Sequence, residues 1–93
     1  MPCFKIEFYG LVQGVGFRAL IKRGANTYNL KGEVWNDPGD VNKVVAFVEG
    51  TYENIFNFLT YIFSKQEQGG PLIEHMKIYS TNCSYKDFRI TYR

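Results

Sequence analysis

Residues 12–18, Val-Gln-Gly-Val-Gly-Phe-Arg, join a stretch of alternating apolar and polar residues to a stretch with helical spacing. Gly14 and Gly16 can adopt the positive φ angles that a tight strand-to-helix turn requires. The first N–H groups of a helix have no partner within it, and Arg18 adds a guanidinium that can bind two oxygen atoms at once. The segment therefore predicts a strand, a glycine turn and a helix whose N-terminus binds an anion such as phosphate. The backbone amides expected to converge on this anion are those of Gly14, Val15, Gly16, Phe17 and Arg18.

The remaining sequence repeats this alternation of strand and helix patterns. Period-two alternation or β-branched residues predict strands over 4–9, 31–36, 41–49 and 73–79, and a last strand from Phe88 onward. Helical spacing runs from Phe17 to Tyr28, with Asn29 suited to a left-handed cap, and again after Thr51, a candidate N-cap, as far as the glycines before Pro71. Asp37-Pro38-Gly39-Asp40 predicts a turn between two strands.

This order indicates an α+β fold, a ferredoxin-like βαββαβ two-layer sandwich. We expect an antiparallel sheet with both helices on one face and a short additional strand at the C-terminal end. Because strand–helix–strand crossovers are right-handed, the first two strands run parallel and end at the same edge of the sheet. Arg18 begins the helix beyond the first strand, and Asn36 ends the second strand. The two side chains should therefore meet at one anion site.

Composition limits the class of protein. With 93 residues, 45% of them hydrophobic, the chain is expected to form a single globular domain over residues 1–93. The net charge is only +2 and the basic residues are scattered, so charge alone does not predict a nucleic-acid partner. No apolar stretch approaches the roughly 18–20 residues that cross a bilayer, and the N-terminus lacks a signal-like core. We expect a cytoplasmic protein without a membrane partner.

Two cysteines, Cys3 and Cys83, are too few for a disulfide framework and lack the spacing of a zinc site. We expect two free structural thiols, with one bridge between the chain ends as the alternative.

Other polar residues offer weaker candidates for chemistry. His75, the sole histidine, lacks an identified nucleophile or orienting partner and is expected to be structural or merely exposed. Asp37 and Asp40 are expected to form local turn hydrogen bonds rather than a metal site, because further oxygen ligands are missing. The glycine turn also lacks the third glycine of a dinucleotide fingerprint and the Gly-Lys-Ser/Thr of a Walker A loop, which disfavours nucleotide binding.

Residues 10–18, Gly-Leu-Val-Gln-Gly-Val-Gly-Phe-Arg, resemble the signature of the acylphosphatase family. Residues 30–36, Leu-Lys-Gly-Glu-Val-Trp-Asn, are similar to the strand that carries the family's catalytic asparagine, and the ending from Phe88 also fits. The resemblance covers nearly the whole chain.

The resemblance implies an enzyme that hydrolyses the carboxyl–phosphate bond of small acyl phosphates to a carboxylate and inorganic phosphate. By this resemblance, Arg18 and the turn amides hold the phosphoryl oxygens, and Asn36 positions the attacking water. It implies no metal and no cofactor. Phosphate or sulfate is expected as an active-site ligand, and the protein is expected to be a monomer.

Two other functions remain open from the sequence. Trp35 and Tyr9 are expected on the sheet face away from the helices. RNA-recognition domains share this architecture and stack bases on sheet aromatics, so a non-enzymatic nucleic-acid-binding module is the alternative. Residues 43–49 lack the glycine and aromatic spacing of such a module. The resemblance also extends to the start of larger carbamoyltransferases, for which this chain is expected to be too short.

Overall fold

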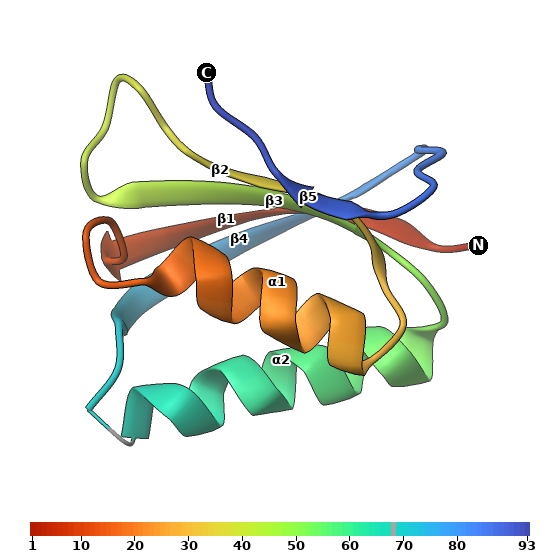
Figure 1. Ribbon diagram of the computed structural model, residues 1–93, viewed down its shortest axis with the longest axis horizontal. Coiled ribbons are helices and arrows are strands. Elements are labelled where there is room, and N and C mark those ends of the chain that lie inside the picture. Colours follow the sequence, from red (N-terminus) through yellow and green to blue (C-terminus); the bar gives the residue numbers. More distant parts are fainter. Residues whose placement is uncertain (68) are drawn as a thin grey trace.

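The computed structural model describes residues 1–67 and 69–93 and has two layers, a five-stranded sheet and two helices (Figure 1). The strand order across the sheet is β4-β1-β3-β2-β5, in which β2 and β5 are parallel and the other neighbours antiparallel. The elements are β1 (Cys3–Leu11), α1 (Phe17–Thr27), β2 (Lys31–Asn36), β3 (Lys43–Glu49), α2 (Tyr52–Glu67), β4 (Leu72–Thr81) and β5 (Phe88–Ile90). The predicted ferredoxin-like sandwich with an added strand is confirmed.

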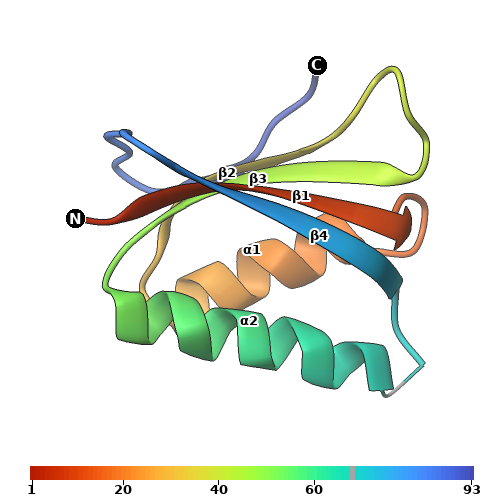
Figure 2. The same cartoon turned by 180° about the vertical axis from the view of Figure 1, so that it is seen from behind.

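Both helices cover the same face of the sheet, as the view from behind also shows (Figure 2). Alternate residues of β1 point into this layer, so Ile6 and Phe8 are fully buried, and Phe8 meets Phe17 of α1 edge to face with ring centroids 5.1 Å apart. Phe58 of α2 is also fully buried. The period-two and helical patterns of the sequence thus meet in one core between the layers.

Helix boundaries follow the predicted signals. Asn29, just after α1, has a φ of 56°, the left-handed conformation that asparagine tolerates better than most residues. At the start of α2, the hydroxyl of Thr51 accepts a hydrogen bond of 3.1 Å from the N–H of Asn54.

Four strands differ in their bounds from the prediction. β1 runs from Cys3 to Leu11 rather than over 4–9. β3 begins at Lys43 rather than Val41, because Asp40 prolongs the turn: its carboxylate accepts the N–H of Asn42 at 2.9 Å and its carbonyl accepts the N–H of Lys43 at 3.2 Å. β4 extends beyond 73–79 because it pairs with the full length of β1. β5 is limited to Phe88–Ile90.

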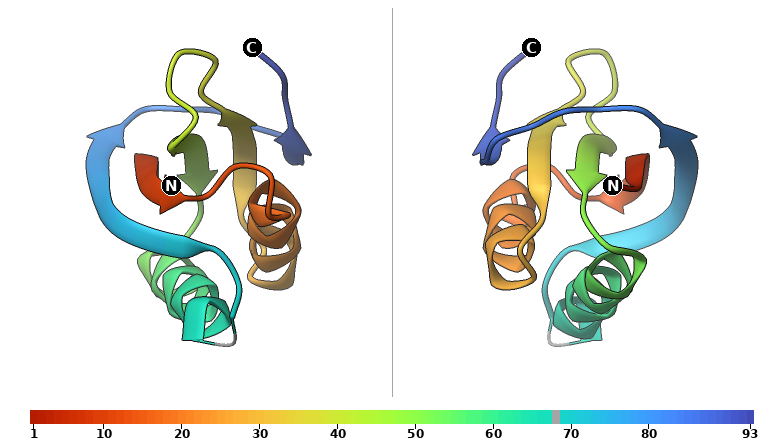
Figure 3. Two further views of the ribbon diagram at one scale, coloured as in Figure 1. Left: turned by 90° about the vertical axis from the view of Figure 1, so that its left-hand side faces the viewer. Right: turned by 90° about the vertical axis from the view of Figure 1, so that its right-hand side faces the viewer.

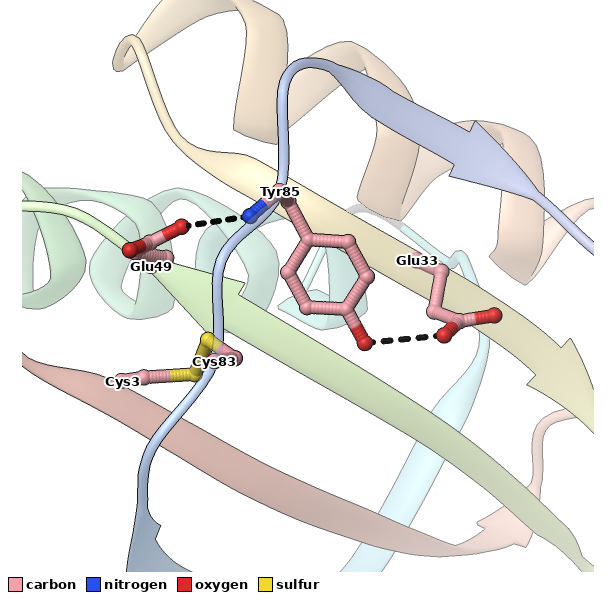
Figure 4. The surroundings of a disulfide bond; sticks show 5 residues. All are labelled: Cys3, Glu33, Glu49, Cys83 and Tyr85. Carbon is pink, nitrogen blue, oxygen red and sulfur yellow. Dashed lines mark hydrogen bonds between the residues drawn. A yellow bond between two sulfur atoms is a disulfide. The ribbon is translucent and has the colours of Figure 1, made fainter.

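The connection from β4 to β5 has to pass from one edge of the sheet to the other. It crosses the outer face, by which we mean the sheet face opposite the helices (Figure 3). Cys83 in this connection forms a disulfide with Cys3 of β1 (Figure 4), so the expectation of two free thiols is wrong. The pairing depends on this long-range crossing, which brings together two cysteines 80 positions apart in the sequence.

Candidate active site

The loop between β1 and α1 has the predicted glycine conformation. Gly14 and Gly16 have φ angles of 74° and 76°, and Gly16 is the N-terminal boundary residue of α1. A Cβ at either position would have no atom within 4 Å, so backbone conformation rather than crowding favours glycine there. Within residues 1–67 and 69–93, the N–H groups from Gly14 to Arg18 donate to no protein acceptor. The loop therefore presents free donors at a helix N-terminus.

Arg18 lies in the first turn of α1, a turn that contains no acidic residue. Its guanidinium carbon lies 5.3 Å from the centre of the Tyr92 ring. In the described part of the chain, no carboxylate comes within ion-pair distance of Arg18. Its positive charge is therefore not neutralised by a protein carboxylate at close range.

Asn36 is the last residue of β2 and, two positions after the fully buried Val34, lies on the helix-covered face of the sheet. Its side-chain oxygen Oδ1 is buried and accepts no hydrogen bond from the described residues. Buried acceptors without a donor are rare because they lose their hydration and gain nothing in return.

Two cavities share Arg18, Asn36 and Tyr92 in their walls, so the structure brings Arg18 and Asn36 together as the crossover topology predicted. The smaller cavity, of about 160 Å³, adjoins the glycine loop. The larger, of about 320 Å³, lies between the β2–β3 turn and the segment after β5. We call them the loop cavity and the outer cavity. The loop cavity is also lined by Val12, Gly14, Gly16, Phe17, Ala19 and Ile90, and the outer cavity by Gln13, Asp37, Pro38, Val41, Thr91 and Arg93.

Gln13 ties the glycine loop to the β2–β3 turn. Its Nε2 donates to the carbonyl oxygens of Asp37, Asp40 and Lys43 at 3.2, 3.0 and 2.9 Å. Because these three acceptors lie across the turn, a single side-chain amide fixes the turn against the loop. Figure 1 shows the loop and the turn at the same end of the sheet.

Glu33 of β2 fixes the segment after β5 from the outer face. Its Oε1 accepts hydrogen bonds from the hydroxyl of Thr91 at 2.9 Å and from the guanidinium of Arg93 at 3.0 Å. Its Oε2 accepts the phenol hydrogen of Tyr85 at 2.8 Å (Figure 4). Burial and the hydrogen bond to Glu33 raise the pKa of Tyr85 to about 12, so this phenol stays a donor at neutral pH.

An ion pair between Glu7 and Lys43 lies next to the β2–β3 turn on the outer face. Glu7 of β1 is buried, which by itself would raise its pKa, but the hydrogen bond and positive charge of Lys43 lower that pKa overall. The hydrogen bond to Glu7 raises the pKa of Lys43, whose ammonium lies 3.1 Å from Glu7 and 3.9 Å from Asp37. At neutral pH this ion pair holds the start of β3 against β1.

The structure places the weaker candidates in other roles. His75 of β4 stacks on the ring of Tyr9 with centroids 4.4 Å apart and lines neither cavity. The carboxylates of Asp37 and Asp40 accept the N–H groups of Gly39 and Asn42, which are the local turn hydrogen bonds expected from the sequence. Among the described residues, no group of three or more potential metal-binding side chains lies together.

Sequence reasoning did not single out Gln13, Glu33, Tyr92 or Arg93. Gln13 stands inside the motif of residues 12–18, which was the available signal. Glu33 lies on β2 within residues 30–36, but its role depends on partners that are distant in the sequence. Those partners, and Tyr92 and Arg93 themselves, reach this site only because the connection from β4 to β5 crosses the sheet.

The fold and the loop define a ferredoxin-like α+β protein with free amides and an arginine at a helix N-terminus. The sequence profile of the acylphosphatase family matches residues 4–90. The chain is 31% identical to an acylphosphatase of Methanothrix thermoacetophila, with 97% of each chain covered, and 33% identical to one of Thermotoga maritima, with 99% of each covered. The chain belongs to the acylphosphatase family, a family of hydrolases.

Structural comparison agrees on the fold. The fold is similar to the crystal structure of an acylphosphatase from Bacillus subtilis, with a TM-score of 0.83, 24% identity and coverage of 99% of this chain and all of that one. It is also similar to part of full-length HypF in a phosphate- and nucleotide-bound form, with a TM-score of 0.83 and 32% identity, but this chain spans only 12% of that protein. The probable carbamoyltransferase HypF of Methanocaldococcus jannaschii is 42% identical over 62 residues, and the match spans 8% of its length. No helix in residues 1–67 or 69–93 is long and apolar enough to cross a membrane.

Proposed function

We propose that this protein hydrolyses small acyl phosphates in the two cavities beside the glycine loop. The phosphoryl group binds in the loop cavity, and the acyl group lies in the outer cavity. The observation that carries the proposal is the position of Arg18, which has no close carboxylate partner among the described residues, in one cavity with Gly14, Gly16 and Phe17, whose amides are free. These groups together form a site for a tetrahedral dianion. Val15, also predicted to contribute an amide, does not line this cavity.

Hydrolysis follows from placing a water molecule behind the phosphorus atom. Asn36 Oδ1 accepts a hydrogen bond from this water, which satisfies a buried oxygen that has no donor among the residues the structure describes. The water oxygen forms a bond to phosphorus, the bond between phosphorus and the acyl oxygen breaks, and the carboxylate leaves with the bonding electrons. The proton of the water passes to phosphate or solvent. Arg18 and the amides stabilise charge on the equatorial oxygens throughout.

The chemistry of the substrate explains why so few groups suffice. A carboxylate is a stable anion and leaves without protonation, so no general acid is required. Phosphoryl transfer then depends on positioning and on stabilising the charge of the transferred group. The proposal therefore uses no metal and no cofactor.

The substitution Arg18→Ala tests the proposal. We expect it to lower kcat/KM for acetyl phosphate by about 10²-fold or more, the scale for removing one preorganised oxyanion partner. Phosphate release from acetyl phosphate, monitored at a fixed ionic strength, measures this ratio.

Arg23→Ala is the matched control, because Arg23 is an exposed arginine of the same helix and lines neither of the two cavities. It is expected to retain full activity. Near-normal hydrolysis by Arg18→Ala, or no hydrolysis by the unmodified protein, contradicts the proposal.

The proposed unit is one domain of residues 1–93 acting as a monomer, since the site is assembled from one chain: the loop after β1, the start of α1, the end of β2, the β2–β3 turn, and the end of β5 with the segment after it. A cytoplasmic location stays a prediction of the sequence. The Cys3–Cys83 bond is a type of bond that is rare in that reducing compartment outside hyperthermophiles.

A further inference from the structure

Tyr92 has an unusual position for a large side chain. The residue is 80% exposed, so it contributes little to the core, yet it lines both the loop cavity and the outer cavity. Its ring faces the guanidinium of Arg18 at 5.3 Å, within the range of a cation–π interaction. Tyr92 is thus the aromatic neighbour of the residue that binds the phosphoryl group in the proposed function.

The chain around Tyr92 is fixed although its ring is exposed. The N–H of Thr91 donates to the carbonyl of Val34 at 2.9 Å, and the hydroxyl of Thr91 and the guanidinium of Arg93 both bind Glu33. Arg93 also lies over the ring of Trp35, 4.1 Å from its centre. Contacts on both sides of Tyr92 therefore hold its backbone at the edge of the cavities.

An aromatic ring suits Arg18 better than a carboxylate would. A carboxylate neutralises a guanidinium and uses its N–H donors, whereas a ring attracts the cation and leaves those donors for the oxygens of a ligand. A long side chain that is already oriented also loses less conformational entropy when it binds.

We propose that Tyr92 is a positioning residue that holds the Arg18 guanidinium ready for the phosphoryl group. Glu33 supports Tyr92 in this role because it binds the two neighbouring residues, Thr91 and Arg93. This inference rests on the proposed function, and it assigns to the segment after β5 a part in substrate binding.

The test compares Tyr92→Leu with Tyr92→Phe. Leucine removes the ring, and we expect kcat/KM for acetyl phosphate to fall by about 2- to 10-fold, the range of an exposed or partly desolvated cation–π pair. The inhibition constant of inorganic phosphate should rise by a similar factor, because Arg18 contacts the phosphoryl oxygens of both ligands. Phenylalanine keeps the ring, and its values should stay within about twofold of the unmodified protein.

Two further measurements separate positioning from general stability. In an Arg18→Ala background, Tyr92→Leu should change kcat/KM by less than about twofold, since its effect passes through Arg18. In NMR spectra, the Nε–Hε signal of Arg18 should shift in Tyr92→Leu and stay in Tyr92→Phe, because ring currents act on nearby protons.

Tyr79→Leu is the matched control. Tyr79 lies on β4, is 46% exposed and has the Lys5 ammonium 5.8 Å from the centre of its ring. Tyr79→Leu therefore removes an equivalent cation–π contact at a place away from the two cavities. It should leave kcat/KM and phosphate binding unchanged.

The outcomes distinguish this inference from the proposed function. If the unmodified protein does not hydrolyse acetyl phosphate, the proposed function fails, while the Arg18 signal still tests the contact with Tyr92. If hydrolysis is normal and Tyr92→Leu leaves kcat/KM and phosphate binding unchanged, Tyr92 does not position Arg18. Equal losses in the Leu and Phe variants, or an effect that persists without Arg18, also overturn the inference.

Discussion

At the scale of single residues, Asn36 Oδ1 is the atom whose surroundings require an explanation. It is buried and finds no donor in residues 1–67 or 69–93, although a buried unpaired acceptor costs about 1–3 kcal/mol. Such a cost is common where an atom serves a ligand rather than the fold. The proposed water at the phosphorus atom supplies the missing donor.

We predict that Asn36→Ala lowers kcat for acetyl phosphate by about tenfold or more, the equivalent of one hydrogen bond of roughly 1.4 kcal/mol. KM should change little, because Arg18 and the loop amides still bind the phosphoryl group. Steady-state kinetics measure both constants.

The same variant should unfold at the same or a higher urea concentration, since it removes an unsatisfied buried oxygen. Asn26→Ala is the control, because Asn26 is an exposed asparagine of α1. It removes the same side chain at a position outside the two cavities. An Asn36→Ala variant with normal circular dichroism and unchanged kcat would exclude the proposed role.

At the scale of elements, one side chain couples the glycine loop to the β2–β3 turn. Gln13 supplies a donor to three carbonyls of the turn, and Asp37, Pro38 and Val41 of that turn line the outer cavity. The glycine loop and the turn, which flank the phosphoryl and acyl groups in the proposed function, therefore keep a fixed distance.

Gln13→Leu leaves these carbonyls without that donor and should lower the free energy of unfolding by about 1–2 kcal/mol. Gln13→Glu should lower it further, because carboxylate oxygens would then face carbonyl oxygens. Urea denaturation measures the order of the three proteins. Hydrogen exchange should speed up over residues 37–42, where the turn is released. A Glu variant as stable as the unmodified protein would show that the three hydrogen bonds do not hold the turn.

At the scale of the whole molecule, the connection from β4 to β5 crosses the outer face and is attached to three strands in turn. Cys83 is bonded to Cys3 of β1, the N–H of Tyr85 donates to Glu49 of β3 at 3.0 Å, and the phenol of Tyr85 donates to Glu33 of β2 (Figure 4). These attachments fix the route by which β5 and the segment after it reach the cavities.

We predict that the double variant Cys3→Ser/Cys83→Ser is less stable than the oxidised protein by about 2–4 kcal/mol, since the disulfide closes a loop of 80 positions and restricts the unfolded chain. Thermal and urea unfolding of the oxidised, reduced and double-variant proteins measure the difference. The reduced protein should match the double variant. Equal stability of all three would mean that the bond contributes nothing to the fold.

Several features were predictable from the sequence because they depend on neighbours along the chain. The alternation from Phe4 to Tyr9 and the glycines of residues 12–18 defined the strand, the turn and the helix start. The handedness of the crossover then brought Arg18 and Asn36 to one edge. The start of β3 at Lys43 was missed because Asp40 and Gln13 hold the turn through side-chain hydrogen bonds that strand propensity does not contain.

By itself, the sequence determined the order of the elements, the glycine loop and the placement of Arg18 and Asn36 at one site, since periodicity, positive φ and crossover handedness are local or general properties. Only the tertiary structure decided the disulfide, the attachment of Glu33 to Thr91 and Arg93, and the position of Tyr92 over Arg18. These contacts join residues far apart in the sequence, and they form only because the connection from β4 crosses the sheet and returns the chain to the opposite edge.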